Sequence, residues 1–199
     1  MNIAVIDYGA GNLTSVLKGL RAAGAAPTVT SDPDDVAGAG AIVVPGVGHF
    51  GATAAIGAEL RASLLRAAAA GTPLLGICLG LQFLFEGSVE APGIPGLALL
   101  RGECFLLPPA DGVKIPHVGW NTLARRNASR LLSDADDGAQ VYFTHSYAAP
   151  VTGATTASCE HGATFAAVVE RGNLFGVQFH PEKSGDAGLR ILRAFVSSC

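Results

Sequence analysis

The chain has 199 residues, of which 49% are hydrophobic and 15% are charged, and its formal net charge is -3. This length and composition predict one α/β domain over residues 1–199 and exclude a disordered chain. Lysine and arginine together total only 13 and form no basic stripe, so no nucleic acid partner is expected.

The four cysteines argue against a disulfide framework and against a zinc site. No pair has the C-x-x-C spacing, and none lies beside a histidine at metal-ligand spacing. The chain opens on a strand-like segment without a basic and apolar leader, and no run of about 18 apolar residues follows. We therefore expect a cytoplasmic protein with no membrane span and no metal or other cofactor.

Strands and helices alternate regularly over the first 85 residues. The expected strands cover residues 1–8, 27–30, 41–44 and 73–77. The expected helices begin after Asn12 and after Asp32, and two more cover 52–70 and 79–85. This alternation predicts an open, mostly parallel sheet flanked by helices, with functional groups outside the carboxyl ends of the strands.

The second half of the chain changes character, because strand-like runs follow one another with little helix between them. These runs cover residues 98–107, 114–123, 140–147, 155–160, 165–170 and 174–179. They predict additional antiparallel or mixed strands in the C-terminal half. A last helix is expected over residues 186–196.

The stretch Gly76-Ile77-Cys78-Leu79-Gly80 lies where a strand gives way to a helix. Such a corner forces Cys78 into strained backbone angles and pushes its thiol outward, and the flanking glycines leave room for the neighbouring chain. The first amides of the helix favour negative charge on the sulfur and can receive an oxyanion. The alternative is a small buried thiol that only fills the core of the sheet.

His180 is the best candidate base for Cys78 among the five histidines. Apolar residues alternate over 175–179 and leave His180 and Glu182 together on the other side of the strand. Pro181 reinforces this arrangement, because a proline holds the preceding residue in extended geometry. A carboxylate beside an imidazole is the orienting group of a triad, so we predict a triad of Cys78, His180 and Glu182. The alternative is an exposed strand end with an incidental histidine and glutamate.

The turn Pro45-Gly46-Val47-Gly48 follows the third expected strand. Residues 46–51 match G-x-G-x-x-G formally, but the next strand ends at Cys78 and lacks the acidic residue of a dinucleotide site. We predict instead that the amides of Val47 and Gly48, with that of Leu79, form an oxyanion hole over Cys78. An ordinary glycine turn is the alternative.

These motifs resemble those of the class I (triad) glutamine amidotransferases. Residues 76–82 and Phe179-His180-Pro181-Glu182 carry the resemblance. Further matches narrow it to the glutaminase subunits of imidazole glycerol phosphate synthases, which belong to histidine biosynthesis. These matches are residues 6–12, 45–48, 117–121 and 144–147 and Lys183. They run from residue 6 to residue 184, whereas residues 90–107 match no motif.

The resemblance implies a flavodoxin-like α/β fold and a glutaminase without a cofactor. It makes Cys78 the thiolate that attacks the side-chain amide of L-glutamine, with His180 as the proton shuttle and Glu182 as its orienting group. A γ-glutamyl thioester then forms, and water releases glutamate. The residues that would hold the substrate are Gln82, His145, Ser146 and Tyr147. For Gln82 the alternative is a polar residue on a helix surface.

The resemblance also implies a heterodimer with a (β/α)8 cyclase subunit, which receives the ammonia and makes imidazole glycerol phosphate and an aminoimidazole carboxamide ribotide. The residues that would face this partner are Asn12, Trp120, Tyr142 and Lys183. Each also has a structural explanation, as a helix cap, a core aromatic or a solvated amine. The isolated subunit is expected to be slow, and the turn at Val47 is expected to move on activation.

Three other functions compete with this one. The nearest is an amidotransferase subunit for anthranilate or pyridoxal phosphate synthesis, which residues 7–12 and 45–48 disfavour. A free-standing cysteine hydrolase of γ-glutamyl bonds would hydrolyse glutamine without any cyclase. A flavodoxin-like binding module without activity is disfavoured, because all three residues of the predicted triad are present.

Overall fold

The computed structural model describes all 199 residues and is built around an eight-stranded sheet. The strand order is β2-β1-β3-β4-β13-β12-β11-β8. Their bounds are β1 (Asn2–Ile6), β2 (Ala26–Thr30), β3 (Ala41–Val44), β4 (Leu74–Ile77), β8 (Ala124–Arg125), β11 (Thr155–Glu160), β12 (Thr164–Arg171) and β13 (Leu174–Val177). The first five strands in this order pair in parallel and the remaining pairs are antiparallel, which confirms the predicted mostly parallel sheet with added antiparallel strands.

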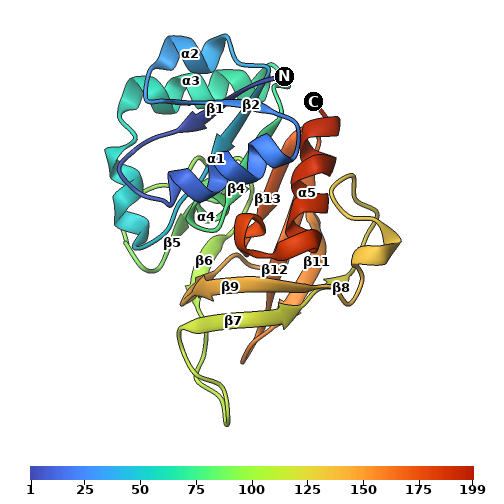
Figure 1. Cartoon of the computed structure of the whole chain (residues 1–199). Helices are drawn as coiled ribbons and strands as arrows, with labels where there is room; N and C mark the ends of the chain where they lie inside the picture. The colour runs from blue at the N-terminus through green and yellow to red at the C-terminus, as the bar shows by residue number, and fades with distance from the viewer.

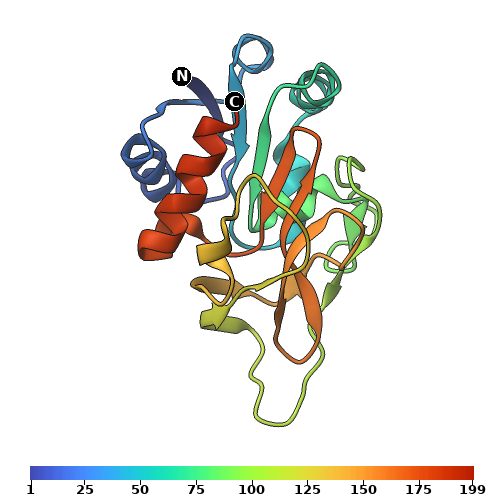
Figure 2. The same ribbon diagram turned by 90° about the vertical axis from the view of Figure 1, so that its right-hand side faces the viewer.

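Helices cover both faces of this sheet (Figures 1 and 2). One face carries α1 (Leu13–Ala22) and α5 (Gly185–Ser197), and the other carries α2 (Pro33–Ala37) and α3 (Ala58–Ala69). The predicted caps of the first two helices are present: the Asn12 side chain accepts from the Ser15 amide, and the Asp32 side chain accepts from the Asp34 amide. The helices bury apolar side chains against the sheet, and α1 and α2 each start at a residue whose side chain caps the helix.

Two smaller sheets lie beside the carboxyl end of the parallel strands. One has the order β10-β6-β5, with β5 at Gly87–Ser88, β6 at Glu103–Leu106 and β10 at Tyr147–Ala148. The other pairs β7 (His117–Thr122) with β9 (Gln140–His145) in antiparallel register, at the bottom of Figure 1. None of the helices is long and apolar enough to cross a lipid bilayer.

Some of the predicted boundaries were wrong. The expected helix over 52–70 is broken into a 3-10 helix, η1 (Phe50–Ala55), and α3, because Ile56 and Gly57 are extended and the chain turns to bury Ile56. The strand expected over 98–107 is reduced to β6, since Ala98 (φ +53°) and Gly102 (φ +107°) interrupt the extended backbone.

Two further strands are shorter than expected. The strand predicted over 140–147 is divided into β9 and β10, which belong to different sheets. The strand predicted over 174–179 ends at Val177, and Pro181–Lys183 forms a 3-10 turn, η3. The residues after Val177 are therefore not part of a regular strand.

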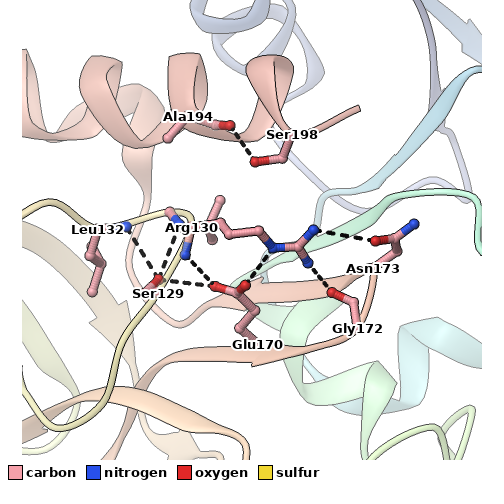
Figure 3. Close-up of polar contacts among 9 residues, drawn as sticks. Ser129, Arg130, Leu132, Glu170, Gly172, Asn173, Ala194 and Ser198 are labelled. Carbon is pink, nitrogen blue, oxygen red and sulfur yellow. Dashed lines mark hydrogen bonds and ion pairs between the residues drawn. The ribbon is translucent and has the colours of Figure 1, made fainter.

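A polar network around Arg130 ties a loop to the amino end of β13 (Figure 3). The Arg130 guanidinium pairs with the Glu170 carboxylate at 2.7 Å, donates to the Gly172 carbonyl and lies over the Phe175 ring. The Ser129 hydroxyl donates to the same carboxylate at 3.0 Å. Every charged group in this network has a partner, so we assign it a purely structural role.

Candidate active site

Cys78 occupies the corner between β4 and the short helix α4 (Leu79–Leu84), with φ +53° and ψ -105°. This left-handed conformation costs a non-glycine residue roughly 1–3 kcal/mol and persists only where the surroundings hold it. The flanking glycines have the predicted steric role. A Cβ on Gly80 would lie 1.8 Å from the Val44 carbonyl oxygen, and one on Gly76 would lie 2.5 Å from the Gly80 carbonyl oxygen.

The sheet brings His180 to this corner, because β13 lies next to β4 in parallel register. Ile77 pairs with Val177, and the Cys78 amide donates to the Val177 carbonyl at 2.8 Å. Both strands therefore end at the same edge, where His180 is 1% exposed and Cys78 is 4% exposed. The arrangement agrees with the rule that active groups gather at the carboxyl ends of parallel strands.

His180 and Glu182 form a buried pair. The His180 Nδ1 atom lies 2.8 Å from the Glu182 Oε1 atom, and the two side chains are only 2% and 1% exposed. The predicted reason for this contact was wrong, since Glu182 lies in the η3 turn and not on a continued strand. Helix α5 packs closely against this turn at Gly188, where a Cβ would lie 1.9 Å from the Pro181 carbonyl oxygen.

The charges around His180 favour its protonated form. Burial lowers the pKa of His180, but the nearby Cys78 sulfur and then the Glu182 carboxylate outweigh burial and raise it to about 9. The imidazole therefore carries a proton at neutral pH when the thiol is ionised. A thiolate beside an imidazolium is the arrangement of an activated cysteine nucleophile.

Three buried polar atoms around Cys78 lack a hydrogen-bond partner in the chain. They are the Nε2 atom of His180, the Oε2 atom of Glu182 and the hydroxyl of Tyr8. Burial raises the pKa of this tyrosine, and the negative charge of Cys78 raises it further. The Tyr8 hydroxyl also lies against the predicted oxyanion turn, where a Cβ on Gly46 would come within 2.3 Å of it.

A cavity of about 290 Å³ opens over Cys78. Its walls include all the predicted oxyanion and substrate residues. The lining residues are Val47, Gly48, Cys78, Leu79, Gln82, Glu90, Pro116, Thr144, His145, Ser146 and Tyr147. The amides of Val47 and Gly48 donate no hydrogen bond within the chain and remain available to a ligand. The cavity therefore brings the Cys78 side chain together with the Val47–Gly48 turn, whose amides have no backbone partner.

Comparison with known proteins decides the class of this site. Residues 4–199 match the family model described as glutamine amidotransferase class-I. The chain belongs to the class-I glutamine amidotransferase family. Its fold agrees, since a chain of the PurLQS structure from Thermotoga maritima superposes with a TM-score of 0.76 at 20% identity, covering 99% of this chain and 98% of that one. A solved glutamine amidotransferase superposes with a TM-score of 0.75 at 17% identity, covering 98% and 97%.

Curated relatives of this amidotransferase are named imidazole glycerol phosphate synthase subunit HisH. The relative from Methanothermobacter thermautotrophicus is 48% identical over 195 residues, which cover 98% of this chain and 97% of the relative. The one from Deinococcus radiodurans is 46% identical over 197 residues, with coverages of 97% and 92%. The chain thus belongs to the HisH group within the family.

Two residues of the amidotransferase cavity region were not predicted from sequence. The Glu90 carboxylate accepts a hydrogen bond from the Phe50 amide at 2.6 Å and is the only acidic group on the cavity wall. The buried Gln178 side chain accepts from the Ala149 amide and turns its Nε2 atom toward the Cys78 sulfur at 3.8 Å. A glutamine at the end of an apolar strand was a signal for Gln178. Glu90 belongs to no motif, and its hydrogen-bond partner Phe50 lies 40 positions away in the chain.

The residues predicted to face a partner lie in two places. Trp120 is 56% exposed and lies against Tyr142, with ring centroids 6.1 Å apart, and the Lys183 ammonium lies 5.8 Å from the Tyr142 ring centroid. These three side chains form one surface cluster beside the η3 turn of the amidotransferase. Asn12 is exposed at the start of α1, where it caps the helix.

Proposed function

We propose that this chain is the glutaminase subunit of an imidazole glycerol phosphate synthase, with Cys78, His180 and Glu182 as its catalytic triad. The observation that carries the proposal is the buried His180–Glu182 pair, 2.8 Å apart, beside a cysteine in a strained elbow. The HisH relatives supply the substrate class and the pathway, which is histidine biosynthesis.

The reaction divides into two acyl-transfer steps. In the first, the Cys78 thiolate attacks the side-chain carbonyl carbon of L-glutamine, and the amides of Leu79 and of the Val47–Gly48 turn stabilise the oxyanion. The His180 imidazolium gives its Nε2 proton to the departing nitrogen, so that ammonia leaves and a γ-glutamyl thioester remains. In the second step the neutral imidazole takes a proton from water, and the resulting hydroxide attack releases glutamate and the thiolate.

Glu182 keeps its charge throughout this cycle and orients the imidazole through Nδ1. Its Oε1 atom accepts a hydrogen bond from the Nδ1–H group of His180, which leaves the Nε2 atom directed at the reacting groups. That Nε2 atom has no partner in the chain, which suits a group that must exchange its proton with the substrate.

The cavity walls match the two ends of a free amino acid. Glu90 offers the one negative charge for the α-ammonium group of L-glutamine, and the backbone around His145, Ser146 and Tyr147 offers polar groups for the remainder. The Gln82 amide completes the wall beside Cys78. The Phe50 amide already donates to the Glu90 Oε2 atom, so the Oε1 atom is the one left for a ligand.

The cyclase partner is proposed to dock on the face that carries Trp120, Tyr142 and Lys183, with Asn12 at its margin. Exposed large apolar side chains are scarce on this chain, and Val118 and Trp120 on β7 are two of the most exposed, at 58% and 56%. Aromatic residues beside a cation are typical of interface centres. The same face borders the η3 turn that holds Glu182.

The experiment that tests this function is release of glutamate from glutamine by the chain alone, by the chain with a cyclase subunit, and by the pair with the cyclase's ribotide substrate. We expect slow release alone and a large increase with partner and ribotide together. Equal and rapid release in all three conditions would favour a free-standing hydrolase. No release in any condition would refute the proposed function.

A further inference from the structure

A line of hydrogen bonds runs from strand β7 to the wall of the cavity. The Asn121 Nδ2 atom lies 3.2 Å from the His117 Nε2 atom, and the His117 Nδ1 atom lies 3.2 Å from the His145 Nε2 atom. The His145 Nδ1 atom lies 3.0 Å from the Tyr147 carbonyl oxygen, which also accepts from the Gln82 Nε2 atom at 2.7 Å. Both histidines are buried, at 3% and 7% exposure.

The Asn121 end fixes the direction of the first hydrogen bond. The Asn121 Nδ2 atom also lies 3.0 Å from the Glu160 carbonyl oxygen, while its Oδ1 atom accepts from the Thr122 amide at 2.7 Å. The Glu160 backbone carbonyl can only accept, and the Thr122 backbone N–H can only donate. These two partners therefore fix which end of the Asn121 side chain is the NH2 group. The Nε2 atom of His117 must therefore accept, and its proton sits on Nδ1.

The Tyr147 end fixes the same direction independently. Its carbonyl oxygen can only accept, so the His145 Nδ1 atom must carry a proton and the His145 Nε2 atom must accept. That acceptor faces the His117 Nδ1 atom, which is the protonated nitrogen according to the Asn121 end. Both ends therefore assign the Nδ1–H tautomer to both histidines.

This arrangement leaves neither histidine free for acid–base or metal chemistry. All four imidazole nitrogens are engaged, and a second proton on either ring would place two donors against each other. Burial lowers the pKa of His117 to about 4 and that of His145 to about 3, and the neighbouring histidines lower both further. No group of three or more potential metal ligands exists in the structure.

We infer that His117 and His145 form a neutral relay that positions the Gln82 side chain in the substrate cavity. The inference rests on the proposed function, because it assigns these histidines to the glutamine site. The Nε2 atom of Gln82 donates to the Tyr147 carbonyl, whereas its Oε1 atom accepts no hydrogen bond from the chain and is left for the substrate in the cavity. Both histidines are positioning residues, since neither touches the reacting atoms.

The relay also continues toward the nucleophile. The Gln82 Nε2 atom lies 3.5 Å from the Gln178 Oε1 atom, and the Gln178 Nε2 atom faces the Cys78 sulfur. A rotated Gln82 amide would place two carbonyl oxygens against each other at Tyr147 and again at Gln178. The Tyr147 carbonyl and the Gln178 side chain therefore select one of the two orientations of Gln82, and the His145 Nδ1–H group holds that carbonyl in place.

Strand β7 carries this relay on one face and the proposed docking residues on the other. His117 and Asn121 point inward, whereas Val118 and Trp120, which alternate with them, are exposed. His117 is further clamped between the rings of His161 and Phe143, with centroids 3.9 and 4.7 Å away. Any assay of the relay therefore has to be made in the assembled complex, with the outer face of β7 covered.

The test uses three variants in complex with the cyclase subunit and its ribotide. His117→Phe keeps an aromatic ring in the stack but removes both nitrogens, so we expect the KM for glutamine to rise roughly five- to tenfold with kcat changed less than about twofold. His117→Asn places an amide N–H near the lost Nδ1–H and is expected to keep KM within about threefold of wild type. His161→Phe, the matched control, preserves the stack and the relay and should leave KM unchanged.

Two results would overturn the relay: a His117→Phe variant with wild-type KM, or equal losses in the Phe and Asn variants. A second measurement does not depend on activity. Side-chain 15N–1H spectra of the histidines should identify His117 and His145 as neutral Nδ1–H tautomers at pH 7, and Nε2–H tautomers would refute the relay. If wild-type complex releases no glutamate, the proposed function fails, while these spectra still decide whether the relay exists.

Discussion

The two ends of strand β13 carry two polar networks of opposite character. At the amino end, Arg130 and Glu170 are 43% and 12% exposed, and the charged groups are paired with each other, with Ser129 or with backbone carbonyls. At the carboxyl end, His180 and Glu182 are 2% and 1% exposed, yet each retains one buried atom without a partner. The more deeply buried network is thus the less completely satisfied one.

An unpaired buried polar atom costs about 1–3 kcal/mol, so an incomplete network needs a reason to persist. At the carboxyl end the reason is the reaction, because a group that must donate to or accept from a substrate cannot be saturated by the protein. At the amino end the protein itself supplies a partner for each charged group. Unsatisfied atoms, more than burial or charge, distinguish the reactive end of this strand from the structural end.

The largest expected effect comes from removing one carboxylate at each end. Glu182→Gln should lower kcat for glutamine hydrolysis roughly 10²- to 10⁴-fold, because the amide can no longer stabilise the imidazolium. Glu170→Gln, the matched control, should leave kcat within about twofold and lower only the free energy of unfolding. Steady-state glutamate release gives kcat for both variants, and urea denaturation gives their free energies of unfolding. Similar losses of kcat in the two variants would contradict the difference proposed between the two ends of β13.

Gly80→Ala is expected to lower the free energy of unfolding by about 3 kcal/mol, since the added methyl group would lie 1.8 Å from the Val44 carbonyl oxygen. Gly153→Ala serves as the control, because Gly153 lies in a loop, a Cβ there meets nothing within 4 Å and its φ is outside the positive range that strains other residues. Urea unfolding midpoints of the two variants give the comparison. A wild-type midpoint for Gly80→Ala would mean that the backbone at Cys78 is more adaptable than its geometry indicates.

The sequence predicts the frame of the molecule better than the contacts within its site. Alternating strands and helices placed Cys78 and the Val47 turn at the same sheet edge, and the structure has them there, because parallel register follows directly from the order of the elements. The helix caps at Asn12 and Asp32 were also predictable, since each depends on a side chain two or three positions from the amide that it accepts from.

Contacts between distant segments could not be predicted in this way. Glu90 lines the cavity and accepts a hydrogen bond from the Phe50 amide, and the relay joins His117 to His145 across two strands of a separate small sheet. Neither contact is reflected in the periodicity of the residues around it, so the sequence pattern does not indicate it. The turn at Pro181–Lys183 was mistaken for a strand because a proline after an extended residue is compatible with both.

Acid should destabilise the protein through its buried neutral histidines. The folded-state pKa of His117 lies near 4, below the ordinary value of about 6.5, so the unfolded chain binds the extra proton between these values and stability falls as the pH is lowered through this window. This group alone should cost about 2 kcal/mol between pH 7 and pH 5. Urea denaturation of wild type and His117→Asn should show the smaller acid loss in the variant, and equal losses would mean that His117 is protonated in the fold.

The smallest effect is expected at the amino end of β13. Arg130→Met keeps an aliphatic stem over the Phe175 ring but removes the half-exposed ion pair with Glu170, so unfolding should become easier by about 1 kcal/mol. The KM and kcat for glutamine should stay at their wild-type values. A change in KM would show that the two ends of the strand are coupled and would weaken the distinction between them.

The most direct test of the account is a Cys78→Ala variant assembled with the cyclase subunit and supplied in turn with glutamine and with ammonium salts. We predict that synthesis from glutamine is abolished and that synthesis from ammonium proceeds at the wild-type rate, because the nucleophile serves only to release ammonia. Loss of synthesis from both nitrogen sources would contradict the account and make Cys78 a structural residue.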